Sequence, residues 1–216
     1  MKNTFYVVML LFISNSFSQS IFLKSGLNMT SYDYKDSKGN TNENIKPSSG
    51  VFYEIGYTMS IKTGGRGKYR AYGPYSRLKA SSSISINQYN ATGGNLVDSY
   101  DWKTNYLGWN NFLNYSFTDQ DDLINTGIKF GLGFSTLISG TQRIDGQSFD
   151  LMKNQEFNAL WFYPMVGLEV KYDLYQDAFL SLGYDYSKLF SLTGKSKEKL
   201  SFNNSQIRFG ITIFVN

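Results

Sequence analysis

Val51–Ile61 reads VFYEIGYTMSI, and apolar and polar residues alternate along it almost from end to end. Side chains on a β-strand point alternately to opposite faces, so one face of this stretch is wholly apolar or aromatic. The other face carries Glu54, Gly56 and hydroxyl side chains beside Phe52. About eleven residues is also the length that a tilted strand needs to cross a lipid bilayer. The stretch therefore predicts a strand that is either half-buried in a soluble protein or inserted in a membrane.

The same alternation recurs along the chain. It predicts further strands at about residues 20–32, 75–89, 103–117, 125–138, 159–172, 178–186 and 205–215. Together with 51–61 these make eight strands, and the expected fold is an all-β, eight-stranded antiparallel up-and-down transmembrane β-barrel. Pro164 has no N–H to donate, so we expect a bulge or a weak hydrogen bond in the sixth strand.

The connections between the predicted strands are expected to alternate in length. Those after the first, third, fifth and seventh strands are long and polar: Asp33–Ser49, Asn90–Asp101, Ser139–Phe157 and Lys188–Asn204. The other three are shorter. Because outer-membrane barrels have short periplasmic turns and longer extracellular loops, the long connections are predicted to face the cell exterior.

The N-terminus resembles a secretory signal. Lys2 supplies the positive charge, Phe5–Ile13 an apolar core, and Ser16-Phe17-Ser18 a cleavage pattern of small residues. We therefore expect residues 1–18 to be a signal peptide, cleaved before Gln19, and residues 19–216 to form the barrel domain.

The composition narrows the chemistry. The chain has no cysteine, which excludes disulfides, thiolate metal sites and thiol catalysis. It also has no histidine, the commonest general base and metal ligand. The formal net charge of +4 is spread along the chain and gives no electrostatic footprint for nucleic acid. We expect no enzymatic activity, no cofactor, no metal and no nucleic-acid partner.

The polar faces of the predicted strands indicate which face is outside. A soluble lipocalin-like barrel turns its apolar face inward, whereas a membrane barrel turns it toward lipid. Glycine recurs on the polar faces, where it would weaken a solvated exterior but would make room inside a narrow barrel. The space would be taken by the large side chains Phe52, Trp161, Tyr163 and Arg208. This pattern favours the membrane arrangement.

Charged residues of both signs share the polar face. We expect them to form an ionic network in the barrel interior, since buried charges must pair: Lys24, Glu54, Arg77, Lys79, Lys129, Glu169, Lys171, Asp185 and Arg208. Apart from Lys103, the first residue of the fourth predicted strand, the apolar face has no charge within the predicted strands. That difference also favours a lipid-facing exterior.

Four segments resemble the PorT-like outer-membrane β-barrel family. They are LKSGLNMT (23–30), YLGWNNFLNYSF (106–117), GIKFGLGFSTLISG (127–140) and IRFGITIFVN (207–216). The resemblance implies a small integral outer-membrane barrel. Some relatives serve protein secretion, a role that the resemblance alone does not assign to this chain.

Three functional hypotheses follow. The first is a structural or interaction barrel of a Gram-negative outer membrane, surrounded by lipid, whose extracellular loops meet a protein or surface partner. The second is a narrow porin-like channel or an accessory in transport or secretion. The third is a soluble periplasmic lipid-binding barrel with the two faces reversed.

Overall fold

The computed structural model describes residues 19–35, 38–41, 44–61, 77–94, 99–118, 122–144, 146–175, 178–193 and 199–215. Its elements are β1 (Gln19–Lys35), β2 (Ile45–Ser60), β3 (Leu78–Gly94), β4 (Ser99–Ser116), β5 (Ile124–Ile144), β6 (Gln147–Asp150), the 3-10 helix η1 (Leu151–Lys153), β7 (Leu160–Tyr175), β8 (Ala178–Ser191) and β9 (Lys199–Val215). The predicted signal peptide (1–18) and residues 62–76 lie outside the described residues, so the expected cleavage stays a prediction.

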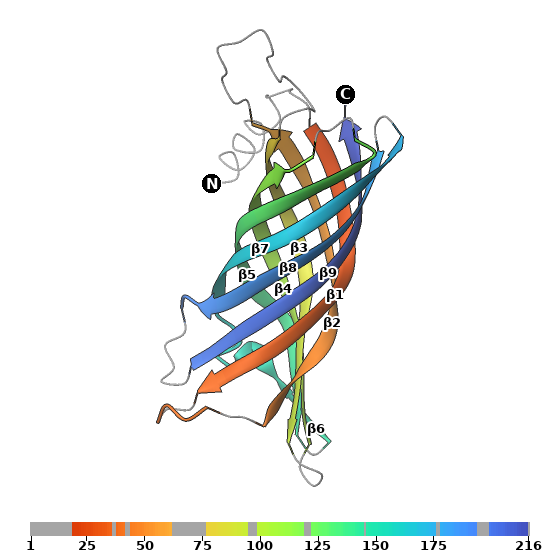
Figure 1. Cartoon of the computed structure of the whole chain (residues 1–216). Helices are drawn as coiled ribbons and strands as arrows, with labels where there is room; N and C mark the ends of the chain where they lie inside the picture. Colours follow the sequence, from red (N-terminus) through yellow and green to blue (C-terminus); the bar gives the residue numbers. More distant parts are fainter. Residues whose placement is uncertain are drawn as a thin grey trace, which may run out of the picture.

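Eight of these strands close into an antiparallel barrel (Figure 1). Each pairs with its neighbour in the chain, β5 pairs with β7 across the β6 excursion, and β1 closes the ring on β9 through pairs such as Leu23 with Ile211. The predicted all-β, eight-stranded up-and-down barrel is confirmed. The short strand β6 pairs with the end of β5 and adds a ninth strand that the sequence did not predict. No helix among the described residues is long and apolar enough to span a membrane.

An apolar belt surrounds one part of the barrel. Alternation turns Leu23, Ile55 and Leu132 outward, with 57%, 57% and 52% of their surfaces exposed. Their neighbours Phe52 and Glu54 point inward and are 1% and 2% exposed. The predicted face assignment is therefore confirmed for this part of the barrel, and the reversed, lipocalin-like arrangement is wrong there. We call this ring of outward apolar side chains the exterior belt.

The strands extend well beyond the exterior belt. β1 has 17 residues, and at ~3.3 Å per residue and a tilt of about 45° it rises about 40 Å along the barrel axis, against about 25 Å for an apolar membrane band. Much of each connection predicted as a long loop is strand instead: β3 continues to Gly94, β4 begins at Ser99, and β5 runs to Ile144. β2 ends at Ser60 and β3 begins only at Leu78. The predicted alternation of long and short connections is therefore wrong.

Polarity inverts along the barrel axis. Past the exterior belt the outward positions become polar, as at Asp33, Lys103 and Asn203, while the inward ones become apolar. Fifteen buried side chains form a mainly aromatic core that lies largely there, with Phe112 reaching back to the ionic side chains Lys129 and Arg208: Tyr32, Tyr89, Ala91, Tyr106, Phe112, Leu137, Leu151, Phe157, Ala159, Trp161, Tyr163, Met165, Leu189, Leu200 and Phe202. This end, which we call the far end because it lies opposite Gln19 and Val215 (Figure 1), is built like a soluble barrel.

A bulge on β5 marks the start of the far end. Tyr106 pairs with Leu137, whereas Asn105 pairs with Ser139, so Ile138 is an extra residue. The bulge changes which residues face inward, from odd positions such as Leu137 to even ones beyond it. Pro164 has no bulge: it pairs in register with β5, and pairing toward β8 lapses at 163–164 without a register shift. Of the two alternatives that were expected at Pro164, the weak bonding is present and the bulge is not.

Candidate functional site

The structure brings most of the predicted charged residues together inside the barrel. Six are buried: Lys24, Glu54, Lys129, Glu169, Asp185 and Arg208. Lys79 and Lys171 point into the barrel nearer the end that holds the termini and are partly exposed. Arg77 is a correction, because it is exposed and precedes the first residue of β3. Because Arg77 lies outside the strand, the strand's pleat does not direct its side chain into the barrel. Five of the predicted cations therefore remain inside the barrel, with three anions.

Arg208 joins two carboxylates at the centre of the network. Its guanidinium pairs with Glu54, and its Nη1 lies 2.5 Å from Asp185 Oδ2. Lys129 Nζ lies 2.8 Å from Asp185 Oδ1. Asn110 Nδ2 donates to Glu54 Oε1 at 3.2 Å, and the Ser83 hydroxyl donates to the same oxygen. Each of these buried charges therefore has an opposite partner, which offsets its desolvation.

A second group lies around Glu169. Lys24 pairs with Glu169 Oε1, and Lys171 Nζ lies 3.2 Å from Glu169 Oε2. Lys79 has no carboxylate partner among the described residues, and its Nζ lies 5.8 Å from the centre of the Phe214 ring. The Lys24–Glu169 pair thus links β1 with β7 across the barrel, and the Lys79–Phe214 contact links β3 with β9.

Amide side chains fill the interior between the ionic network and the aromatic core. Gln206 Nε2 donates to Asn28 Oδ1 at 2.6 Å and to Asn87 Oδ1 at 3.1 Å. Tyr163 Oη donates to Asn110 Oδ1 at 2.7 Å. Two cavities inside the barrel measure about 10 and 30 Å³, room for about one and two water molecules. The charged side chains that the sequence singled out thus fill the barrel and line no solute-sized space among the described residues.

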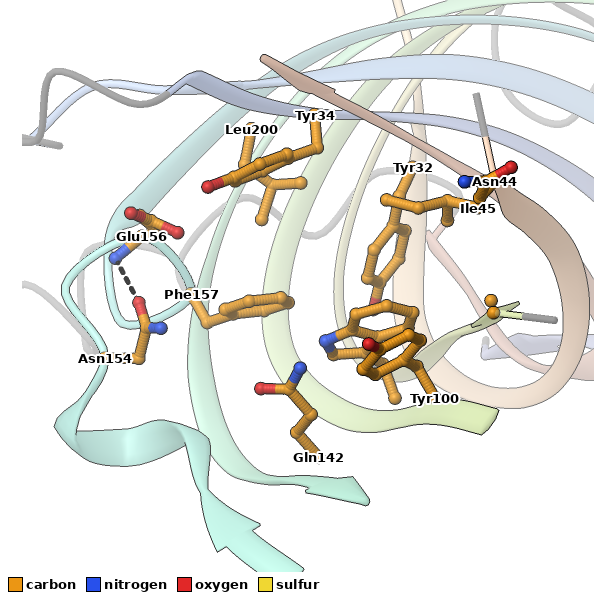
Figure 2. Close-up of a pocket in the computed structure, with 13 residues that line it drawn as sticks. Tyr32, Tyr34, Asn44, Ile45, Tyr100, Gln142, Asn154, Glu156, Phe157 and Leu200 are labelled. Carbon is orange, nitrogen blue, oxygen red and sulfur yellow. Dashed lines mark hydrogen bonds between the residues drawn. The ribbon is translucent and has the colours of Figure 1, made fainter. Parts of the chain in front are cut away.

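A pocket of about 520 Å³ opens at the far end, above the aromatic core (Figure 2). We call it the far-end pocket. β1, β2, β3, β4, β5, β9 and the segment between η1 and β7 all contribute to its wall: Tyr32, Tyr34, Asn44, Ile45, Gly93, Gly94, Tyr100, Trp102, Gln142, Asn154, Glu156, Phe157 and Leu200. Its volume falls in the usual range for small-molecule sites, about 300–1,000 Å³.

Aromatic rings form one wall of the far-end pocket. Tyr100 stacks on Trp102 with ring centres 6.0 Å apart. The Tyr32 ring lies 6.2 Å from Trp102 and 5.9 Å from Phe157. Tyr32 is buried, and its hydroxyl donates to the backbone oxygen of Tyr89 at 2.8 Å. The wall is therefore held in place by the core beneath it.

Polar groups complete the pocket. Asn154 Oδ1 accepts a hydrogen bond from the backbone N–H of Glu156 at 2.8 Å, which orients this carboxamide (Figure 2). Gln142 reaches the pocket because the bulge at Ile138 makes even positions of β5 face inward. Its carboxamide makes no hydrogen bond to any residue that the structure describes. Among the lining residues that the structure describes, Glu156 is the single carboxylate, and none is a lysine or arginine.

Sequence reasoning missed this pocket. Tyr34, Asn44 and Tyr100 fall in segments predicted as long polar loops, as do Gln142 and Phe157. The sequence did contain a signal that the strands extend further. Tyr100 and Trp102 lie at the same even spacing as the inward residues of β4, and Tyr32 and Tyr34 do so in β1. No group of three or more potential metal ligands occurs among the residues that the structure describes.

The fold is shared with known outer-membrane proteins. OprG from Pseudomonas aeruginosa is similar over 91% of this chain and 97% of its own, with 14% identity and a TM-score of 0.51. A major outer-membrane protein from Thermus thermophilus is similar over 93% of this chain and 100% of its own, with 12% identity and a TM-score of 0.51. The sequence matches no family model, and no curated protein sequence is similar to it.

The barrel topology and the exterior belt thus define the class: this is a small transmembrane β-barrel of the outer-membrane type. These comparisons do not distinguish one family of such barrels from another, so membership of the PorT-like family stays a prediction.

Proposed function

We propose that this protein is an integral outer-membrane barrel that neither conducts solutes nor catalyses a reaction, and that acts by presenting its far end to the cell exterior. One observation supports the proposal above all others: the barrel continues past the exterior belt with a core of its own and holds a pocket there. Such an extension is not needed to span a bilayer. Its use lies outside the membrane.

The orientation follows from the extension past the exterior belt. The even number of strands places both ends of the barrel sheet, Gln19 and Val215, at one end of the barrel, and the extension lies at the other end, as the larger extracellular segments of outer-membrane barrels do. The far end, with β6 and the far-end pocket, would then stand above the outer leaflet. The surrounding partner of the belt is outer-membrane lipid, and the partner of the far end is an extracellular molecule or surface.

Two features argue against the alternatives. A free channel is disfavoured because paired ions, amides and aromatic rings fill the interior, and eight strands enclose only enough space for side chains. An enzymatic role is disfavoured because the chain has no histidine and no cysteine. Membership of the PorT-like family also belongs to this proposal, and the four segments that carry the resemblance fall on β1, β4, β5 and β9.

Cysteine labelling on cells tests the proposal. The native chain has no cysteine, so single cysteines at Phe149 (β6) and at Leu123 (the β4–β5 turn) would be the sole reactive thiols. With a membrane-impermeant maleimide we expect Phe149→Cys to react on intact cells and Leu123→Cys to react only after the outer membrane is permeabilised. The opposite pattern, or recovery of the protein in the soluble fraction, would overturn the proposal.

A further inference from the structure

The far-end pocket combines two kinds of surface that one class of ligand matches. Tyr100 and Trp102 offer stacked rings beside Tyr32 and Phe157. The Gln142 carboxamide, which bonds to no described residue, offers a hydrogen-bond donor and an acceptor on the surrounding wall, and the Nδ2 of Asn154 adds a donor. A ligand that fits must therefore carry an apolar face and several hydroxyl or amide groups at its edges.

The charge of the lining restricts the ligand further. No lysine or arginine is among the described residues that line the pocket. A phosphate, sulfate or carboxylate would meet no cation among them, so anionic ligands are disfavoured. A small organic cation could lie over the rings, but it would leave the Gln142 carboxamide, which bonds to no described residue, without a partner, and unpaired polar groups are costly to bury.

A sugar ring has the required chemistry. The C–H groups on one face of a pyranose carry slight positive charge and pack on the negative face of an aromatic ring. Its hydroxyl groups both donate and accept hydrogen bonds, as carboxamides do. The pocket volume of about 520 Å³ leaves room for more than one ring.

We propose that the far-end pocket binds an uncharged or amino sugar at the end of a glycan, with the Tyr100–Trp102 pair as the stacking surface and Gln142 and Asn154 as hydrogen-bonding groups. This inference rests on the proposed function, because the glycan must reach the far end from outside the cell. Such a sugar could belong to the cell's own surface glycolipid or to a foreign glycan.

The test uses the full barrel refolded in nanodiscs that contain phosphatidylglycerol and no alkyl glycoside detergent, since a sugar headgroup would compete. A glycan array is followed by calorimetry with free oligosaccharides: neutral, amino, sialylated and sulfated sugars, oligosaccharide released from the host's surface glycolipid, and choline chloride as a cation. We expect neutral or amino sugars to bind. The glycolipid arm tells an own-cell source from a foreign one.

Three variants make the site assignment falsifiable. Tyr100→Ala and Gln142→Ala are each expected to weaken binding about tenfold or more. Phe149→Ala is the matched control, because Phe149 is exposed on β6 and does not line the pocket, and it should bind like the native protein. Heat-modifiable gel migration checks that each variant is folded.

The inference is wrong if no neutral or amino sugar binds, if only anionic sugars or choline bind, or if the pocket variants bind as well as the control. Its failure is distinguishable from failure of the proposed function. Labelling of Phe149→Cys on intact cells does not depend on any ligand, so a surface-exposed far end that binds no sugar would overturn this inference alone.

Discussion

Single residues show how tightly the barrel interior is filled. A Cβ added at Gly131 would lie 2.5 Å from Phe112, and one added at Gly133 would overlap the Tyr163 ring. The inward glycines therefore make room for large side chains, as predicted for Tyr163. Tyr163 cannot simply move away, because it is 2% exposed and its hydroxyl donates to Asn110.

Gly133→Ala is expected to lower the free energy of unfolding by about 1–3 kcal/mol, the usual cost of overpacking a filled core. Urea unfolding in lipid vesicles measures it. In the double variant Gly133→Ala/Tyr163→Ala the obstructing ring is gone, so the alanine should cost less than it does in the native background. An equal cost in both backgrounds would show that the ring does not set the need for glycine.

Arg208 is the residue on which the ionic network depends most. Arg208→Met removes the ion-pair partner of Glu54 and one of the two partners of Asp185, which keeps Lys129. Removing one partner of a buried ion pair costs about 3–5 kcal/mol. The control is Arg143→Met on the exposed face of β5, which should change stability by about 0.5 kcal/mol or less. Comparable urea midpoints for the two variants would contradict the network's role.

At the scale of elements, the inversion of polarity divides each strand into two parts. Along β9 the outward side chains run from Ser201 and Asn203 to Phe209, Ile211 and Ile213. The first group faces water and the second forms part of the exterior belt. The same substitution should therefore destabilise the barrel far more at one end of the strand than at the other.

A lysine scan of β9 tests this division. Ile211→Lys places a charge in the belt and is expected to cost about 2–4 kcal/mol near the bilayer midplane. Ser201→Lys lies beside Asp33 on the far end and should cost about 0.5 kcal/mol or less. Refolding yield and urea unfolding in vesicles compare the two. Equal tolerance at both positions would show that the belt does not face lipid.

The same division explains what the sequence could and could not predict. Alternation in segments such as Val51–Ile61 predicted the belt half of each strand and its outward face, because one rule of polarity applies there. Past the belt the outward side chains are polar and the inward ones apolar. Polar residues such as Asp33 and Asn203 were therefore predicted to lie in loops, although they belong to strands. The bulge at Ile138 could not be predicted from the alternation. Because the bulge changes which residues of β5 face inward, the inward position of Gln142 could not be predicted either.

At the scale of the whole molecule, three layers follow one another inside the barrel. The ionic network lies within the belt, the amides follow it toward the far end, and the aromatic core closes the far end. Charges of both signs occur on inward positions because they form ion pairs with one another. Since Arg77 is exposed, the interior carboxylates face one cation fewer than predicted. The far-end pocket is thus separated from the opposite end of the barrel by a filled interior.

Planar-bilayer recording tests this closed interior most directly. With the pure refolded protein we expect no steady openings, in conditions where a sixteen-stranded porin measured in parallel gives open channels, because eight strands leave space only for side chains. Steady openings on the nanosiemens scale would contradict the account, and the function would then be that of a channel.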